Sequence, residues 1–236
     1  MAIVSRLNLK KSFKTGNIPT QEDFENLIDS VLHKKEDGLV STDEGLKIYP
    51  SEKYQKFISL YYDHNSTYLD WSLEKYPRNA YDFGLNLTTQ DGFSKVLIAQ
   101  NGNVGLGILD PKARLDVDGN IQCHGRRGTF IHGEVPADKQ WHVIIPSLNG
   151  CNAFEIIAKT SKPGKGMHSM LYAIALSTFN GKRSDISMNH AYYENRRDKM
   201  KLRWTGDDFN YNLEICTKRD FGDDVQIQYY ITKLWW

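Results

Sequence analysis

The chain has 236 residues, a formal net charge of +1 and a hydrophobic content of 40%. This length provides material for one large domain or for two to three small ones. Because the charge is balanced, the sequence predicts neither nucleic acid nor an acidic membrane surface as a partner. Aromatic residues make up 12% and include 13 Tyr, which suits β-structure with large side chains on partly exposed faces.

The N-terminus lacks the apolar run of a secretory signal, and no stretch of about 18 apolar residues predicts membrane insertion. We therefore expect a protein made in the cytoplasm, which acts outside the cell only as part of a larger particle. Cys123, Cys151 and Cys216 are far apart and form no C-x-x-C pair. A disulfide framework or a zinc site is therefore not expected.

The first segment, residues 1–37, contains one predicted helix. Thr20 is a favourable N-cap, and acidic residues follow it in the first turn. The helix is expected to continue until Gly38, with apolar residues in one stripe. Since this narrow stripe cannot form a core alone, we expect a trimer or particle interface there, or packing on the chain's own β-structure. The stripe comprises Phe24, Leu27, Ile28, Val31 and Leu32.

The second segment, residues 38–124, is predicted to consist of short strands and turns. Asp91-Gly92, Asn101-Gly102 and Asp118-Gly119 supply turn signals. No second hydrophobic face can be assigned within one monomer. The pattern therefore predicts a trimeric shaft or collar in which each chain completes the sheets of the others. The strand candidates are 46–49, 57–62, 68–73, 83–87 and 96–99.

The third segment, residues 125–236, has a denser β pattern and predicts an independent domain. About seven strands with turns every 8–12 residues indicate a β-sandwich, jelly-roll-like in arrangement. Residues 171–176 are expected to be buried on both faces, and residues 205–208 to form a turn. The fold class is thus mainly β with an N-terminal amphipathic helix. The strand candidates are 141–145, 154–158, 171–176, 200–204, 211–215 and 225–231.

The most informative motif lies at residues 101–121, with the sequence NGNVGLGILDPKARLDVDGNI. Two short apolar strands flank a turn segment, and Gly, Pro, Asn and Asp residues lie at the positions where a turn favours them. The motif resembles an element of tail fibres and related trimeric fibre proteins of phages and phage-tail-like injection particles, and departs from it mainly at Leu106 and Leu109. In that family the element joins a fibre shaft to the module mounted beyond it.

Two further stretches carry the same resemblance. Residues 11–34 look like the opening of many phage-tail and injection-particle proteins, in which a short F-x-T-G start precedes an amphipathic helix. The stretch 125–236 is similar to a C-terminal domain of tail-fibre-like proteins from Bacteroidetes-type particles. The resemblance implies a homotrimer that contacts tail or baseplate proteins and works in a virion or in an extracellular or cell-associated phage-tail-like particle. The points of likeness in the C-terminal stretch are 127–129, 135–138, 149–155, 201–206 and 231–235.

Enzyme motifs are absent from the sequence, which contains no G-x-S-x-G, no H-E-x-x-H and no phosphate-binding loop. The acidic pairs Asp207-Asp208 and Asp223-Asp224 stand beside glycines and are interpreted as turn residues. No His-x-His pattern predicts a metal on a trimer axis. We therefore expect no catalytic activity, no metal and no cofactor, and place a glycan-degrading tailspike behind the non-enzymatic alternatives.

Exposed aromatic rings are the candidate binding groups, because flat rings stack on sugars or pack at interfaces. The predicted function is adhesion by three weak sites acting together, with a cell-surface glycan or protein as receptor. A purely structural cap, collar or baseplate component fits the resemblance equally well. The candidate ligand-binding residues are Tyr192, Tyr193, Trp204, Tyr211 and Trp236.

Overall fold

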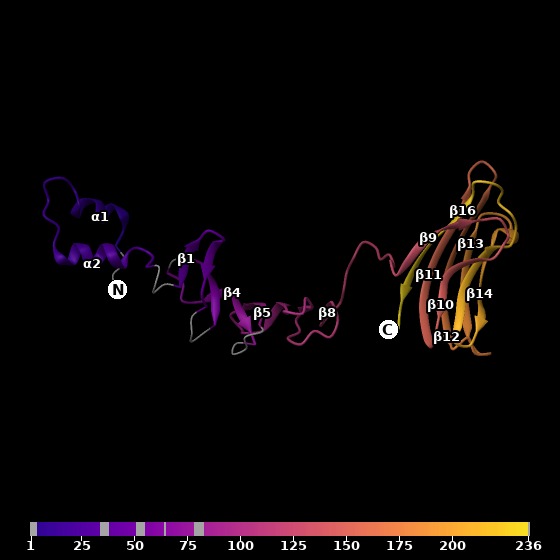
Figure 1. Cartoon of the computed structure of the whole chain (residues 1–236). Helices are drawn as coiled ribbons and strands as arrows, with labels where there is room; N and C mark the ends of the chain where they lie inside the picture. Colours follow the sequence, from indigo (N-terminus) through magenta and orange to yellow (C-terminus); the bar gives the residue numbers. More distant parts are fainter. Residues whose placement is uncertain (1–3, 34–37, 51–54, 64, 78–82, 236) are drawn as a thin grey trace. The chain divides into compact units, whose positions relative to one another are not determined.

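The computed structural model describes residues 4–33, 38–50, 55–63, 65–77 and 83–235 (Figure 1). Strands make up 50% of the described residues and helices 9%, which confirms the mainly β fold. The chain divides into two compact units, Met1–Gln122 and Cys123–Trp236. The predicted boundary between the first two segments falls at residues 34–37, outside the described part. Among the described residues, no helix is long and apolar enough to cross a membrane.

Two short helices, α1 (Arg6–Ser12) and α2 (Gln21–Asp29), open the first unit. The predicted N-cap is confirmed: Thr20 Oγ1 accepts a hydrogen bond from the Asp23 amide, and the Asp23 carboxylate accepts one from the Thr20 amide. The predicted continuation to Gly38 is wrong. The chain leaves the α-helix at the C-cap Ser30, so Val31 and Leu32 lie beyond it.

The remainder of the first unit is β-structure. A two-stranded hairpin joins β1 and β2, and six strands form a sheet in chain order from β3 to β8. All neighbours in this sheet are antiparallel except β7 and β8. Every strand candidate of the second segment is confirmed. The strands are β1 (Leu39–Thr42), β2 (Gly45–Ile48), β3 (Lys56–Tyr61), β4 (Leu69–Tyr76), β5 (Gly84–Thr89), β6 (Ser94–Ile98), β7 (Val104–Leu106) and β8 (Leu115–Val117).

The motif at residues 101–121 forms two strands around a turn, as predicted. The strands β7 and β8 are parallel, and the turn between them is held by side chains. Asn103 Nδ2 donates to the Pro111 carbonyl (3.0 Å), and Arg114 donates to the Asn101 carbonyl (2.9 Å). Gly105 lets the turn approach closely, because a Cβ atom there would lie 2.3 Å from the Ile108 carbonyl oxygen.

The six-stranded sheet buries a polar face. Successive side chains on a strand point to opposite faces, and one face carries a ladder of small polar groups on β4, β5 and β6. Ser72 and Thr88 share a hydrogen bond of 2.7 Å, and Ser94 donates to Asn86 (2.6 Å). Within the described part of the first unit, Leu97 and Pro111 are the only apolar side chains that are buried.

The opposite face of this sheet is apolar. The strand register places two rows of apolar side chains across the strands. Five of these side chains are exposed, with exposed fractions of 36% to 56%, and the other four are half-buried. We call these two rows the apolar face of the first unit. One row is Leu73, Leu87, Val96, Leu106 and Val117, and the other is Leu85, Ile98, Val104 and Leu115.

The second unit consists of two antiparallel sheets around one core (Figure 1). The five-stranded sheet has the order β13-β12-β11-β16-β9, and the three-stranded sheet has the order β10-β15-β14. A 3₁₀ helix, Arg196–Asp198, precedes β14. The strands are β9 (Ile131–Pro136), β10 (His142–Leu148), β11 (Cys151–Lys162), β12 (Met167–Thr178), β13 (Asp185–Tyr192), β14 (Met200–Asp207), β15 (Asn210–Thr217) and β16 (Gln226–Lys233).

Both sheets contribute alternate residues to this core. Phe154, Ile156 and Leu171 come from the larger sheet, while Leu213 and Ile215 come from the smaller one. Their side chains are almost fully buried. The two inner faces therefore supply each other with the apolar contacts that the first unit lacks.

Two predictions for the second unit need correction. Residues 171–176 are buried on one face only, because their burial alternates along β12. The turn between β14 and β15 lies at residues 208–209, since Asp207 still pairs with Asn210. The strands β14 and β15 extend into polar residues, beyond the apolar residues from which they were predicted. The predicted final strand is confirmed, with Ile227, Tyr229 and Ile231 facing inward.

Two adjacent isoleucines on β11 test this arrangement. Ile156 has no exposed surface, whereas 39% of Ile157 is exposed on the outer face. We expect Ile156→Ala to lower the free energy of unfolding by about 2–5 kcal/mol, because it leaves a cavity between the sheets. The matched variant Ile157→Ala should cost less than about 1 kcal/mol. Urea unfolding of the full chain measures both, and equal losses would contradict the inward and outward assignment.

Candidate functional site

The structure does not bring the predicted aromatic residues together on one surface. Tyr193 is 68% exposed and contacts His168 edge to face, while Tyr192 is half-buried on the edge strand β13. Trp204 is half-buried and packs against Phe154 and Tyr211. Trp236 lies outside the described residues.

The prediction that Tyr211 offers an exposed ring is wrong. Its side chain is fully buried, and both hydrogen-bonding roles of its hydroxyl are occupied. The hydroxyl donates to the Gly150 carbonyl (2.9 Å) and accepts from Asn152 Nδ2 (2.7 Å). Tyr211 therefore fixes the turn before β11 to the three-stranded sheet, and a ligand cannot reach it.

A different surface gathers binding groups, namely the outer face of the five-stranded sheet. Here the strand register places outward side chains from four strands in rows. One row runs through Glu134 on β9, Gln228 on β16, Lys159 on β11 and Met170 on β12. The next row runs through His132, Tyr230, Ile157 and Tyr172 on the same four strands. Residues distant in the sequence thus form a continuous surface.

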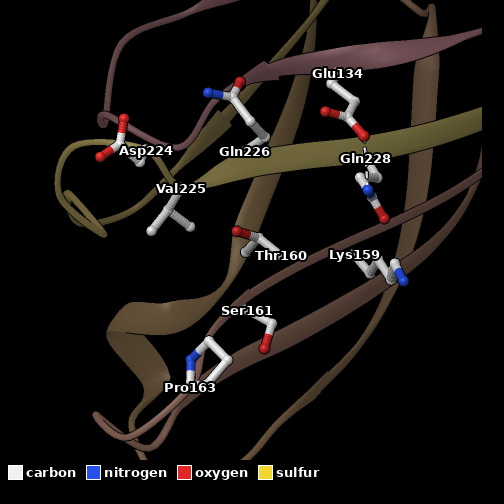
Figure 2. A pocket seen from close by; sticks show the side chains of 9 residues that line it. All are labelled: Glu134, Lys159, Thr160, Ser161, Pro163, Asp224, Val225, Gln226 and Gln228. Carbon is white, nitrogen blue, oxygen red and sulfur yellow. Dashed lines mark hydrogen bonds between the residues drawn. The ribbon is translucent and has the colours of Figure 1, made fainter.

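One end of this surface is a polar groove of about 350 Å³ (Figure 2). Figure 2 shows Glu134 and Gln228 meeting from neighbouring strands, where Gln228 Nε2 donates to the Glu134 carboxylate (2.6 Å). Gln226, Lys159 and Ser161 line the same groove. The groove therefore offers amide, hydroxyl, carboxylate and ammonium groups within one open depression.

The adjoining end is a cationic groove of about 260 Å³, which shares Lys159 and Gln228 with the polar groove. Its other lining groups include Arg126, Arg127 and Tyr230, over an apolar floor. The Arg127 guanidinium lies 4.6 Å from the centre of the Tyr230 ring, a distance at which the ring attracts a cation. The apolar floor consists of Ile157 and Met170.

Glu155 organises the border of the cationic groove. Arg126 Nη2 donates to both oxygens of the Glu155 carboxylate at 2.8 Å, and the Tyr172 hydroxyl donates to the same carboxylate at 3.0 Å. This hydrogen bond to Glu155, followed by burial, raises the pKa of Tyr172 above its ordinary value. Burial of the Glu155 carboxylate is thus compensated by a cation and a hydroxyl.

The two acidic pairs predicted as turn residues and Asp198 lie in turns, at a strand end or in an ion pair. Asp208, Asp223 and Asp224 lie in turns, and Asp207 lies at the end of β14. The buried Asp198 carboxylate pairs with Arg219 beside the 3₁₀ helix. Within the described residues, no three His, Cys, Asp or Glu side chains are grouped so that they can hold a metal ion.

The groove residues were missing from the set of sites predicted from sequence. Three of them could have been found from the sequence, because Gln226, Gln228 and Tyr230 alternate with the buried residues of the last strand and therefore face outward. Lys159 gave no signal, because only the pairing of β11 with β16 brings it beside Gln228.

Comparisons with known protein sequences find no relative. A scan against models of protein families finds no match, and a search of curated proteins finds no significantly similar sequence. The resemblance to phage-tail fibres therefore stays a prediction.

Removing the Tyr211 hydroxyl tests its structural role. Tyr211→Phe leaves the Asn152 amide without one of its partners in a buried site, so we expect a loss of about 1–3 kcal/mol in the free energy of unfolding. The control Tyr193→Phe should be neutral, because that ring is exposed. Denaturant unfolding compares the two, and a neutral Tyr211→Phe would show that the hydrogen bonds contribute nothing.

The raised pKa of Tyr172 gives a pH-dependent prediction. The protonated hydroxyl donates to Glu155, so its stabilising contribution is present at neutral pH and is lost as pH rises through the raised pKa. Glu155→Gln should move the pKa of Tyr172 back down toward 10.0. An NMR titration of the labelled tyrosine ring measures the change. An unchanged pKa would show that Glu155 does not control this hydroxyl.

Proposed function

We propose that this protein is a non-enzymatic structural and adhesion subunit of a phage tail or phage-tail-like contractile injection particle. It works as a homotrimeric fibre, in which the first unit forms the shaft or collar and the second unit, a β-sandwich of jelly-roll-like type, faces a receptor. The resemblance of residues 101–121 to a fibre-joining element supports the class of protein. The different burial in the two units supports the division of roles.

The apolar face of the first unit is the observation that carries this proposal. A sheet that buries polar side chains and exposes two apolar rows gains little from hydrophobic burial as a monomer. Copies of the chain that turn these faces toward a common axis would bury both rows at once. An oligomer through this face therefore supplies the core that the first unit lacks.

The segment around α2 supports the same assembly. Its predicted interface residues contact no core, and exposure ranges from 37% for Leu27 to 71% for Leu32. Only Phe24 has a described aromatic neighbour, Phe13, at 5.3 Å. A nine-residue helix is marginal by itself in water, so contact with sister helices or with a particle subunit would stabilise it. The interface set is Phe24, Leu27, Ile28, Val31 and Leu32.

The second unit is suited to present a binding surface. Its two sheets share their own apolar core, so its outer face is not needed to complete the fold. Three copies of a weak site on one trimer raise the effective concentration for each successive contact. Adhesion therefore needs no deep pocket in the individual chain.

The alternative role is a cap, collar or baseplate component without a receptor. The same exposed apolar rows favour it, because they can pack against other particle subunits instead of sister chains. The two roles differ in the state of the isolated protein. A fibre subunit forms a trimer by itself, whereas a component completed by other subunits does not.

Light scattering on the purified full chain tests the proposal. We expect a particle of three times the chain mass of 27.2 kDa. Leu87→Glu places a charge in the centre of the apolar face and should dissociate the trimer or lower its stability strongly, because the charge would be buried without a partner.

The matched control is Gln90→Glu, which adds the same charge on the exposed turn between β5 and β6. This variant should remain a trimer. A monomeric wild-type protein would overturn the fibre assignment and favour the particle component. A trimer that Leu87→Glu does not weaken would exclude the apolar face as the contact.

A further inference from the structure

We propose that the outer face of the five-stranded sheet binds an oligosaccharide in which a sugar bearing a carboxylate adjoins a neutral sugar. This inference rests on the proposed receptor-binding role and names the class of ligand. It follows from the two adjoining grooves, which share Lys159 and Gln228 and differ in charge.

The cationic groove has two cations available for a ligand. Arg126 is held by both oxygens of Glu155, but Arg127 and Lys159 contact no carboxylate within the described residues. Arg127 is instead placed over the Tyr230 ring. A guanidinium presents a planar pair of donors that matches a carboxylate, and a nearby ammonium adds a point charge. This end is therefore suited to the carboxylate of an acidic sugar.

The floor of the cationic groove suits the ring of the same sugar. Tyr230, Ile157 and Met170 present apolar and aromatic surface beside the cations. Met170 is 54% exposed. The Tyr230 ring also stacks on His132 at 5.9 Å, which limits its rotation. A sugar ring that packs on the apolar floor beside this fixed ring therefore costs little side-chain entropy at Tyr230.

The polar groove favours a neutral sugar. Gln226 and Gln228 supply amide groups that both donate and accept, as sugar hydroxyls require. Gln228 is oriented by its hydrogen bond to Glu134. The carboxylates of Glu134 and Asp224 also line this groove, so a second acidic group here would meet like charge. The two ends therefore favour one acidic and one neutral sugar in a defined order.

An acidic peptide fits this surface less well. Peptides commonly add as a strand to a free sheet edge, but β11 and β16 are paired on both sides. Although β9 is an edge strand of this sheet, β11 and β16 carry Lys159, Gln228 and Tyr230 and offer a ligand their side chains alone. The mixture of amides, an aromatic face and separated charges matches hydroxyl groups and a single carboxylate.

The test uses the full-length protein and an array of short oligosaccharides, each with one uronic or nonulosonic acid linked to neutral sugars. The same compounds with the carboxylate converted to a neutral methyl ester serve as paired probes. We expect the acidic forms to bind at least about tenfold more tightly than their esters, with affinity falling as salt rises.

Variants then locate the site. Arg127→Gln and Lys159→Gln should each weaken binding of the best acidic probe by about tenfold and remove most of its preference over the ester. Lys182→Gln makes the same charge change on an exposed loop away from both grooves and should leave binding unchanged. Circular dichroism melting confirms that each variant is folded.

Three results would overturn the inference: no binding by any acidic probe, equal binding of acids and esters, or equal binding of a glutamate hexapeptide. Unaltered binding by both groove variants would also exclude this face. These outcomes are independent of the trimer mass, so a failed ligand site leaves the fibre assignment standing. A monomer that still binds acidic probes would reject the fibre and retain the site.

Discussion

The exposure of the apolar face among the described residues of the first unit is the feature on which the proposed role of this protein depends. Its sheet holds Ser72, Asn86 and Thr88 inside and leaves Leu87 and Ile98 outside. Hydrogen bonds satisfy the buried polar side, but they contribute little net stability. In the proposed assembly, the hydrophobic contribution comes from neighbouring chains, which links the fold of the first unit to oligomerisation.

The second unit buries its apolar side chains within itself. Its two sheets face each other, so the alternation along β11 and β12 places one set of side chains in a shared core and leaves the other set outward. Stability and recognition are thereby separated. The inward residues keep the unit folded, while outward residues such as Lys159 and Tyr230 are free to define a binding surface. A change on the outer face therefore leaves the packing of the core intact.

The two grooves show how a sheet forms a site without a deep cavity. Neighbouring strands lie side by side with outward residues in register, so Glu134, Gln228 and Lys159 form one row although they are distant in the sequence. Rigid strands hold these groups at fixed spacing. The polar groove and the cationic groove share Lys159 and Gln228 and differ in charge, because Arg126 and Arg127 line only the cationic groove.

Local patterns determined much of this protein. The Thr20 cap, the strands around residues 101–121 and the alternation of the last strand all follow from short-range rules of capping, turns and side-chain direction. Only the tertiary structure decided which outward residues become neighbours, because strand pairing joins residues far apart in the chain. For the same reason, composition could not separate the buried Tyr211 from the outward Tyr230. That difference depends on which sheet covers which face.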